Sequence, residues 1–207
     1  KAVETAVNGR LWNAGQVCVS PKRVIVPESL YPAFLEKATQ LFGNAKVGDP
    51  LDPETQLAPL SSVKAREDVL SQVEKAVAQG ARLVTGGKKI EGPGAFMQPT
   101  ILTDIKKGMD AYSDEIFGPV LMIYSVKNMD EAVDLANDMM LKDLKDGVQT
   151  IRYQLSTLMT TNGQAPFATI YLEIEDGSEY EEEMALICEE MIKQRLEGMK
   201  NYKGQNV

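Results

Sequence analysis

The sequence predicts an α/β domain with a largely parallel sheet over residues 1–138. Segments with apolar residues at helical spacing alternate with short runs of β-branched and other apolar residues, and turns rich in Gly and Pro separate them. Such alternation is typical of strands that are connected by helices, a connection that makes neighbouring strands parallel. With 207 residues, of which 43% are hydrophobic, the chain is long enough for one or two domains with an ordinary core.

Each element of this domain follows from its local pattern. Gly15 and Gly80 stand where two helical patterns stop, a common place for a left-handed C-terminal cap. Pro27 ends the first strand, and the pair Gly86 and Gly87 predicts a turn after another. The expected elements are, in order, helix 1–14, strand 24–26, helix 29–42, helix 62–79, strand 81–85, strand 97–102, strand 120–126 and helix 129–137.

The pattern changes after Asp138, and a second domain is expected over 139–207. The apolar spacing predicts a helix over 148–159, then a polar loop over 160–166, a strand over 167–174 and another helix that begins near Ser178. Ser178 and Glu181 have the spacing of a capping box. Residues 139–207 therefore predict a helix-strand-helix segment of different character from residues 1–138.

Composition excludes several classes of partner. No stretch of 18 uninterrupted apolar residues occurs, so no membrane span is expected, and the first residues lack the features of a signal peptide. The net charge of −8 argues against a nucleic-acid partner, which requires clustered Lys and Arg. We expect a soluble, cytoplasmic protein.

The scarcity of cysteine and the absence of histidine limit the chemistry. The two cysteines, Cys18 and Cys188, are too few for a disulfide framework or a thiolate zinc site, so no metal site is expected. Without histidine there is no Ser-His-Asp triad, no Cys-His pair and no His-based zinc site. Catalysis would have to use cysteine, carboxylates, Lys, Tyr or a bound cofactor.

Cys18 allows two interpretations from its surroundings. It lies in a predicted loop near Gly15, where backbone amides could face the sulfur, and Lys22 and Arg23 are close enough in sequence to favour the thiolate. It also lies between two valines and could be a small buried hydrophobic residue. Local pattern alone leaves both interpretations open.

Two longer strings indicate a family. Residues 13–21 read NAGQVCVSP and residues 115–120 read EIFGPV. The first resembles the active-site signature of the aldehyde dehydrogenase family, and the second resembles a family motif that follows it. Shorter strings over residues 47–50, 80–84, 86–87, 98–100 and 135–138 match as well, so the resemblance covers residues 1–138, with the succinate-semialdehyde branch as its nearest type.

This resemblance implies roles for three residues. Cys18 would be the catalytic nucleophile that attacks the aldehyde, Glu115 would bind the ribose of the nicotinamide nucleotide, and Phe117 would pack near the nicotinamide ring. The implied cofactor is NAD or NADP, the implied partner is a small aldehyde, and a homo-oligomer is compatible with the family. Taken singly, Glu115 would be interpreted as a solvated acid and Phe117 as a core aromatic residue, and only the combined string indicates a site.

The remaining stretch resembles another family. Strings over residues 144–153, 157–167 and 192–200 resemble anaerobic ribonucleoside-triphosphate reductase, without its glycyl-radical or radical-forming cysteine segments. Cys188 is expected to be structural, and the acidic run over residues 173–190 is expected to be a solvated helix face.

Three hypotheses remain at this point: an aldehyde dehydrogenase piece, a nucleotide reductase piece, or a chimeric or composite chain without catalysis. The family's nucleotide-binding domain, its water-activating glutamate and its oxyanion-hole asparagine would lie before Lys1. The isolated chain is therefore expected not to oxidise aldehydes.

Overall fold

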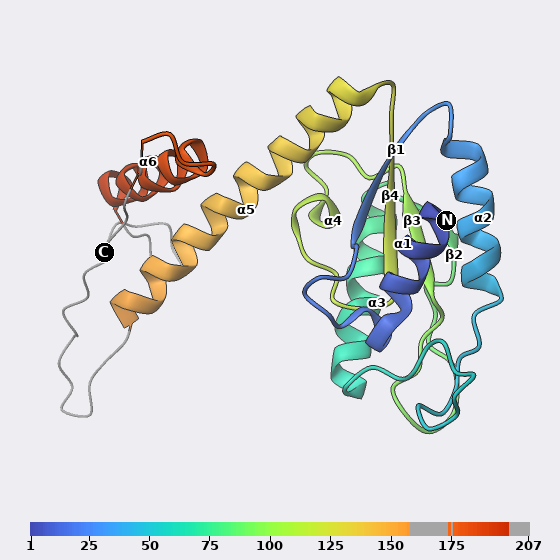
Figure 1. The fold of residues 1–207 in the computed structure, drawn as a ribbon. Coiled ribbons are helices and arrows are strands. Elements are labelled where there is room, and N and C mark those ends of the chain that lie inside the picture. Colours follow the sequence, from blue (N-terminus) through green and yellow to red (C-terminus); the bar gives the residue numbers. More distant parts are fainter. Residues whose placement is uncertain (158–173, 175, 199–207) are drawn as a thin grey trace. The chain divides into compact units, whose positions relative to one another are not determined.

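The computed structural model describes residues 1–157, 174 and 176–198 (Figure 1). It divides into two compact units, Lys1–Leu135 and Ala136–Val207. The division lies close to the expected boundary at residue 138, but it concerns the fold and not the origin of the two segments. The separate origin of residues 139–207 therefore stays a prediction.

The first unit alternates helices and strands in the predicted manner. Its elements are α1 (Ala2–Leu11), the 3₁₀ helix η1 (Trp12–Gly15), β1 (Arg23–Pro27), α2 (Tyr31–Gly43), α3 (Val63–Ala78), β2 (Arg82–Thr85), β3 (Thr100–Thr103), α4 (Asp110–Ser113), β4 (Val120–Val126) and the start of α5 (Met129–Thr157).

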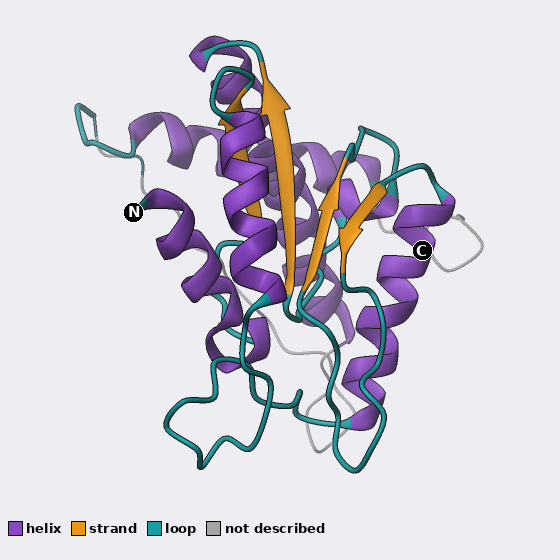
Figure 2. Ribbon diagram, turned by 90° about the vertical axis from the view of Figure 1, so that its right-hand side faces the viewer, coloured by secondary structure: helices purple, strands orange, loops and turns teal. Residues whose placement is uncertain are grey.

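The four strands form one mixed sheet in the order β1-β4-β3-β2. Strand β4 pairs in parallel with both β1 and β3, whereas β2 is antiparallel to β3. The prediction of a largely parallel sheet is confirmed. Helices α1 and α2 pack against each other and contact strands of the sheet, and Figure 2 shows the strands side by side with α2 in front of them.

The core lies along the two central strands. All four residues of β3 are buried, and so is every residue of β4 except Ser125. Strand β4 is almost entirely apolar, as is usual for a strand that is covered on both faces in a parallel sheet. The central strands therefore provide a fixed frame, and the loop that precedes β4 carries Glu115 and Phe117.

The first unit differs from the sequence prediction at three places. The first α-helix ends at Leu11 and not near Ala14, because Asn13 and Ala14 have φ values of 48° and 53° and Gly15 has a φ of 72°. The expected strand 97–102 is found at Thr100–Thr103, while Met97 makes an isolated bridge with Lys89. The one-turn helix α4 was not predicted.

The second unit contains the rest of α5 and helix α6 (Glu181–Glu197). Helix α5 runs without interruption from residue 129 to 157, in place of two expected helices, and an i,i+4 ion pair joins Lys142 to Asp146 within it. The expected capping box does not form at Ser178, because the Glu181 carboxylate accepts a hydrogen bond from the backbone N–H of Gly177.

Some expectations for this unit cannot be compared with the fold. The expected loop at 160–166 and the strand at 167–174 fall outside the described residues, except for Ile174. Within the described part of the chain, no helix combines the length and the apolar character that crossing a membrane requires.

Candidate active site

The loop that carries Cys18 begins with three consecutive residues in the left-handed backbone region. These are Asn13, Ala14 and Gly15, and the turn is closed by a 3.0 Å hydrogen bond from the N–H of Gln16 to the carbonyl of Asn13. This turn reverses the chain after α1 and leads it toward β1. The Cys18 side chain is exposed, so the structure places it at the surface and not among the buried residues of the core.

A side chain within the loop anchors it to the start of α3. The Gln16 amide donates to the Ser61 hydroxyl at 3.0 Å, and its carbonyl oxygen accepts from the Ser61 backbone N–H at 2.9 Å. Two hydrogen bonds from one side chain to one residue fix the direction of both groups. The backbone two residues before Cys18 is therefore held in place.

Residues 115–118 lie directly against this loop. A Cβ atom built on Gly15 would come within 2.1 Å of the Gly118 carbonyl oxygen, so only glycine allows the two backbones to approach this closely. Figure 1 shows the blue segment after α1 beside the yellow-green segment that precedes β4. Glu115 and Phe117 belong to the second of these segments.

Arg10 joins the two segments from inside the unit. Its side chain is fully buried on α1, donates to the carbonyl oxygen of Ile116 at 2.6 Å and to that of Gly118, and donates to the Ser20 hydroxyl at 3.2 Å. Burial lowers the pKa of Arg10 to about 10, while the negative charge of Glu115 acts in the opposite direction. Arg10 thus binds the backbone of the segment that carries Glu115 and a side-chain hydroxyl of the loop that carries Cys18.

Lys22 contacts all three residues that the sequence singled out. Its ammonium group forms an ion pair with the Glu115 carboxylate, donates to the Cys18 carbonyl oxygen at 3.3 Å, and lies 5.9 Å from the centre of the Phe117 ring. The structure therefore brings Cys18, Glu115 and Phe117 together. Their proposed roles are not tested by this proximity.

The exposure of Glu115 and Phe117 fits a contact with a bound nucleotide. The Glu115 side chain is 51% exposed and Phe117 is 40% exposed, so Phe117 is not a core aromatic residue. A carboxylate oxygen accepts hydrogen bonds from the hydroxyl groups of a sugar, and an exposed aromatic ring offers a flat apolar surface to a second ring. These two side chains are therefore able to contact a ligand that has hydroxyl groups and a flat ring.

Of the two cations next to Cys18 in sequence, only Lys22 contacts Cys18. Arg23 donates to the backbone carbonyls of residues 112–114 at 3.2 to 3.4 Å, and Lys22 makes the contacts given above. Cys188 is half-buried on α6, in the second unit. Among the described residues, His, Cys, Asp and Glu side chains form no group of three or more that could hold a metal ion.

Sequence reasoning missed Arg10, Gln16 and Ser61 as parts of the site. Arg10 had a detectable signal, since it follows Val7 by three residues on the buried face of α1, where an unpaired charge is costly. The hydrogen bonds between Gln16 and Ser61 had no detectable signal in the sequence, because the two residues are 45 positions apart. Only the fold brings them together.

Comparison with known proteins identifies relatives of the first unit. The aldehyde dehydrogenase family profile matches residues 1–192. The succinate-semialdehyde dehydrogenase [NADP(+)] of Deinococcus radiodurans is 49% identical over 135 residues, which are 65% of this chain and 28% of that protein. The enzyme of the same name from Mycobacterium ulcerans is 44% identical over 137 residues, covering 66% of this chain and 30% of that protein. The chain thus spans less than a third of the length of these relatives.

Solved structures agree with these matches. Succinic semialdehyde dehydrogenase from Streptococcus pyogenes, in complex with NADP⁺, has a TM-score of 0.64 and 50% identity, covering 66% of this chain and 30% of its own. Betaine aldehyde dehydrogenase from Staphylococcus aureus, in complex with NAD⁺, has a TM-score of 0.63 and 33% identity, covering 66% and 28%.

The family profile and the individual relatives differ in how far they match beyond residue 138. The family profile extends through part of it, to residue 192, whereas the relatives named above cover about two thirds of the chain. Nothing among these matches supports the expected resemblance of residues 141–207 to anaerobic ribonucleoside-triphosphate reductase, which stays a prediction.

Proposed function

Because this chain belongs to the aldehyde dehydrogenase family, we propose that Cys18 is the nucleophile of an NAD(P)-dependent oxidation of an aldehyde to a carboxylic acid. One observation carries the proposal: the exposed Cys18 lies on a loop that Arg10 and Lys22 hold against the segment bearing Glu115 and Phe117. A nucleophile and a cofactor-binding carboxylate must be near each other in such a reaction.

Each residue of the candidate site would have a separate role in the reaction. The Cys18 thiolate attacks the carbonyl carbon, a carbon–sulfur bond forms, and the electron pair of the C=O bond moves to oxygen, giving a thiohemiacetal. Backbone N–H groups of the loop are the donors that this chain offers to that oxygen. The Glu115 carboxylate binds ribose hydroxyls, and the Phe117 ring supports the nicotinamide. The nucleotide, when bound, supplies the hydride acceptor.

Substrate and cofactor follow from the relatives. Several are succinate-semialdehyde dehydrogenases that use NADP⁺, at 44–49% identity over the matched segment. We therefore extend the proposal to a short aldehyde that carries a carboxylate, with NADP⁺ or NAD⁺ as the oxidant. Residues 1–138 would carry this function, and residues 139–207 would not take part in it.

The nucleophile can be tested on the 207-residue chain without a nucleotide. p-Nitrophenyl acetate acylates an activated thiolate and releases coloured p-nitrophenolate, so a burst equal to the protein concentration is expected. Cys18→Ala should abolish the burst, and Cys188→Ala should leave it unchanged. A burst that survives Cys18→Ala, or one that needs Cys188, contradicts the assignment.

The complete reaction can be tested by grafting. Residues 1–138 would replace the matching segment of the Deinococcus radiodurans enzyme, and NADPH formation would be followed by its absorbance with succinate semialdehyde. The graft should be active, and the same graft with Cys18→Ala should lose activity by several orders of magnitude while it still binds NADP⁺. A folded, NADP⁺-binding graft without activity would refute the proposal.

A further inference from the structure

Lys22 is the side chain through which the two halves of the candidate site meet. Its side chain is 19% exposed, and its ammonium group contacts the Glu115 carboxylate and the Cys18 carbonyl oxygen. An ammonium group has three donors and no acceptor, so it can bind both groups at once. Glu115 is on the cofactor side of the site and Cys18 is the nucleophile, so one cation connects both functions.

The other cations near the site are committed elsewhere. The guanidinium group of Arg10 donates to the carbonyl oxygens of Ile116 and Gly118, and that of Arg23 donates to the carbonyls of residues 112–114. Both are fixed on backbone oxygen atoms, which do not change charge. Lys22 differs because one of its partners is a carboxylate that a ligand could engage.

The charge of Lys22 is balanced by Glu115 while the pair is intact. If hydroxyl groups take over the Glu115 oxygens, the ammonium can separate from the carboxylate and keep its contact with the Cys18 carbonyl oxygen. Less of its charge is then cancelled at Cys18. Because Lys22 is mostly shielded from water, an uncancelled charge acts more strongly there than at an open surface. The thiol of Cys18 would then experience a more positive potential.

We propose that Lys22 is a positioning residue that transmits the occupancy of Glu115 to the electrostatic environment of Cys18. The inference rests on the proposed function, in which ribose hydroxyls engage Glu115. Binding of the nucleotide then prepares the nucleophile for an aldehyde that arrives second.

The test measures the potential at Cys18 in the full 207-residue chain. The same thiolate attacks the CH₂–I carbon of anionic iodoacetate and of neutral iodoacetamide and displaces iodide. The ratio of the two rate constants, iodoacetate over iodoacetamide, therefore does not depend on how much thiolate is present. Peptide mass spectrometry gives this ratio for Cys18, with Cys188 as a reference in the same sample. Glu115→Gln imitates loss of the carboxylate charge without any nucleotide.

The proposal predicts a particular pattern among the variants. Glu115→Gln should raise the ratio at Cys18 roughly three- to fivefold, because the charge of the nearby ammonium is then no longer cancelled. Lys22→Met should lower the ratio. In the Lys22→Met background, Glu115→Gln should change it by less than about twofold. Lys37→Met, which removes an exposed ion pair with Glu4, is the matched control and should change nothing.

Two outcomes overturn the proposal. An equal effect of Glu115→Gln with and without Lys22 would mean that the carboxylate acts on Cys18 directly. Equal ratios for Lys22→Met and Lys37→Met would mean that Lys22 has no effect on Cys18. These results can be separated from the proposed function. If the p-nitrophenolate burst is missing but the ratios follow the expected pattern, the role of Cys18 as nucleophile is refuted and the coupling through Lys22 stands.

Discussion

Replacing Gly15 with alanine tests whether the close approach of the two backbones builds the candidate site. An L-residue at the φ of 72° costs about 1–2 kcal/mol. The new Cβ atom would lie 2.1 Å from the Gly118 carbonyl oxygen, whereas ordinary contacts begin at 3.4 Å. The backbone around Gly118 must therefore move away from residue 15. This displacement weakens the charge-assisted hydrogen bond from Arg10 to the Gly118 carbonyl oxygen, which contributes about 1.5–3 kcal/mol. The expected loss of unfolding free energy is therefore about 2.5–5 kcal/mol.

Urea unfolding provides the assay. Trp12 is the single tryptophan of the chain and lies in η1, next to the substituted position, so its fluorescence follows the first unit. A loss of this size lowers the urea midpoint by roughly 2 M. Gly108→Ala is the matched control, because Gly108 also has a positive φ, of 95°, but has no atom within 4 Å of an added Cβ. If Gly15→Ala lowers the free energy of unfolding no more than Gly108→Ala does, the close approach to Gly118 does not stabilise the site.

Further predictions concern reactivity, a buried hydroxyl and pH. Iodoacetamide in limiting amount should label the exposed Cys18 several-fold faster than the half-buried Cys188, and equal rates on the folded protein would contradict this. Ser20→Ala, which removes an acceptor of the buried arginine, should lower the unfolding free energy by about 1–2 kcal/mol in urea; no loss would show that this bond is dispensable. A hydrogen bond from the Gln79 side chain, followed by one from Lys75 of α3, lowers the pKa of Asp110 below its usual value of 3.8. The stability from Asp110 is thus present above pH 3.8 and lost as the pH falls through the lowered pKa, so Asp110→Asn should be less stable than the parent chain at neutral pH and equally stable in strong acid.

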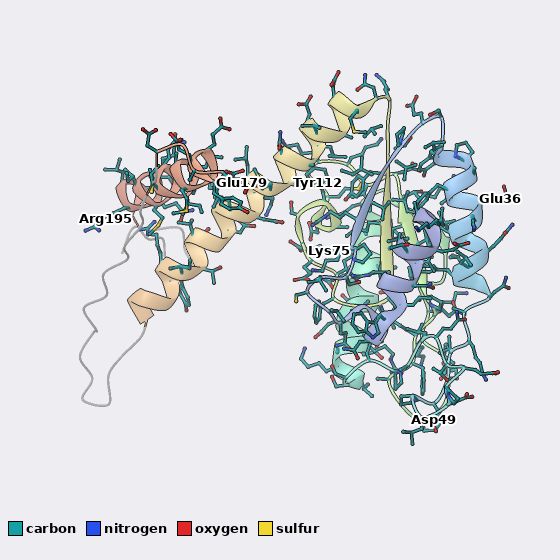
Figure 3. The ribbon with its side chains drawn as sticks, in the orientation of Figure 1. Glu36, Asp49, Lys75, Tyr112, Glu179 and Arg195 are labelled. Carbon is teal, nitrogen blue, oxygen red and sulfur yellow. The ribbon has the colours of Figure 1, made fainter. Side chains whose placement is uncertain are left out.

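The contact of Asp110 joins the long helix α3 to the one-turn helix α4 of the first unit. Lys75 of α3 forms an ion pair with Asp110 at the start of α4, and Gln79 exchanges hydrogen bonds with the same residue. Figure 3 labels Lys75 on α3 and Tyr112 on α4. The contact orients α4, which immediately precedes the segment that carries Glu115.

The sequence predicts the fold well where the pattern is local. Strand β4 is a continuous apolar run and was found over the expected residues, and Ser62 caps α3 with a 3.0 Å hydrogen bond to the N–H of Ala65. The end of α1 was missed because Ala14 is left-handed although alanine favours helices. Nothing local signals that choice, since contacts with residues 61 and 118 impose it.

The candidate site was predictable only in part. The two motif strings identified Cys18, Glu115 and Phe117, and the structure places them around one lysine. The sequence could not reveal that Lys22 connects them, because its contacts with Glu115 and Phe117 span more than ninety residues. Arg23, a neighbour expected to favour the thiolate, instead donates to carbonyls before β4.

The distance along the chain between Arg10 and its acceptors has a consequence for synthesis. The carbonyl oxygens that receive its hydrogen bonds belong to residues 106 and 108 positions later. As the polypeptide leaves the ribosome, α1 emerges with a charged side chain whose acceptors have not yet been made, so this helix cannot bury its inner face until residue 118 is outside the exit tunnel. The loop of Cys18 consequently acquires its final form only after the segment that carries Glu115 has been synthesised.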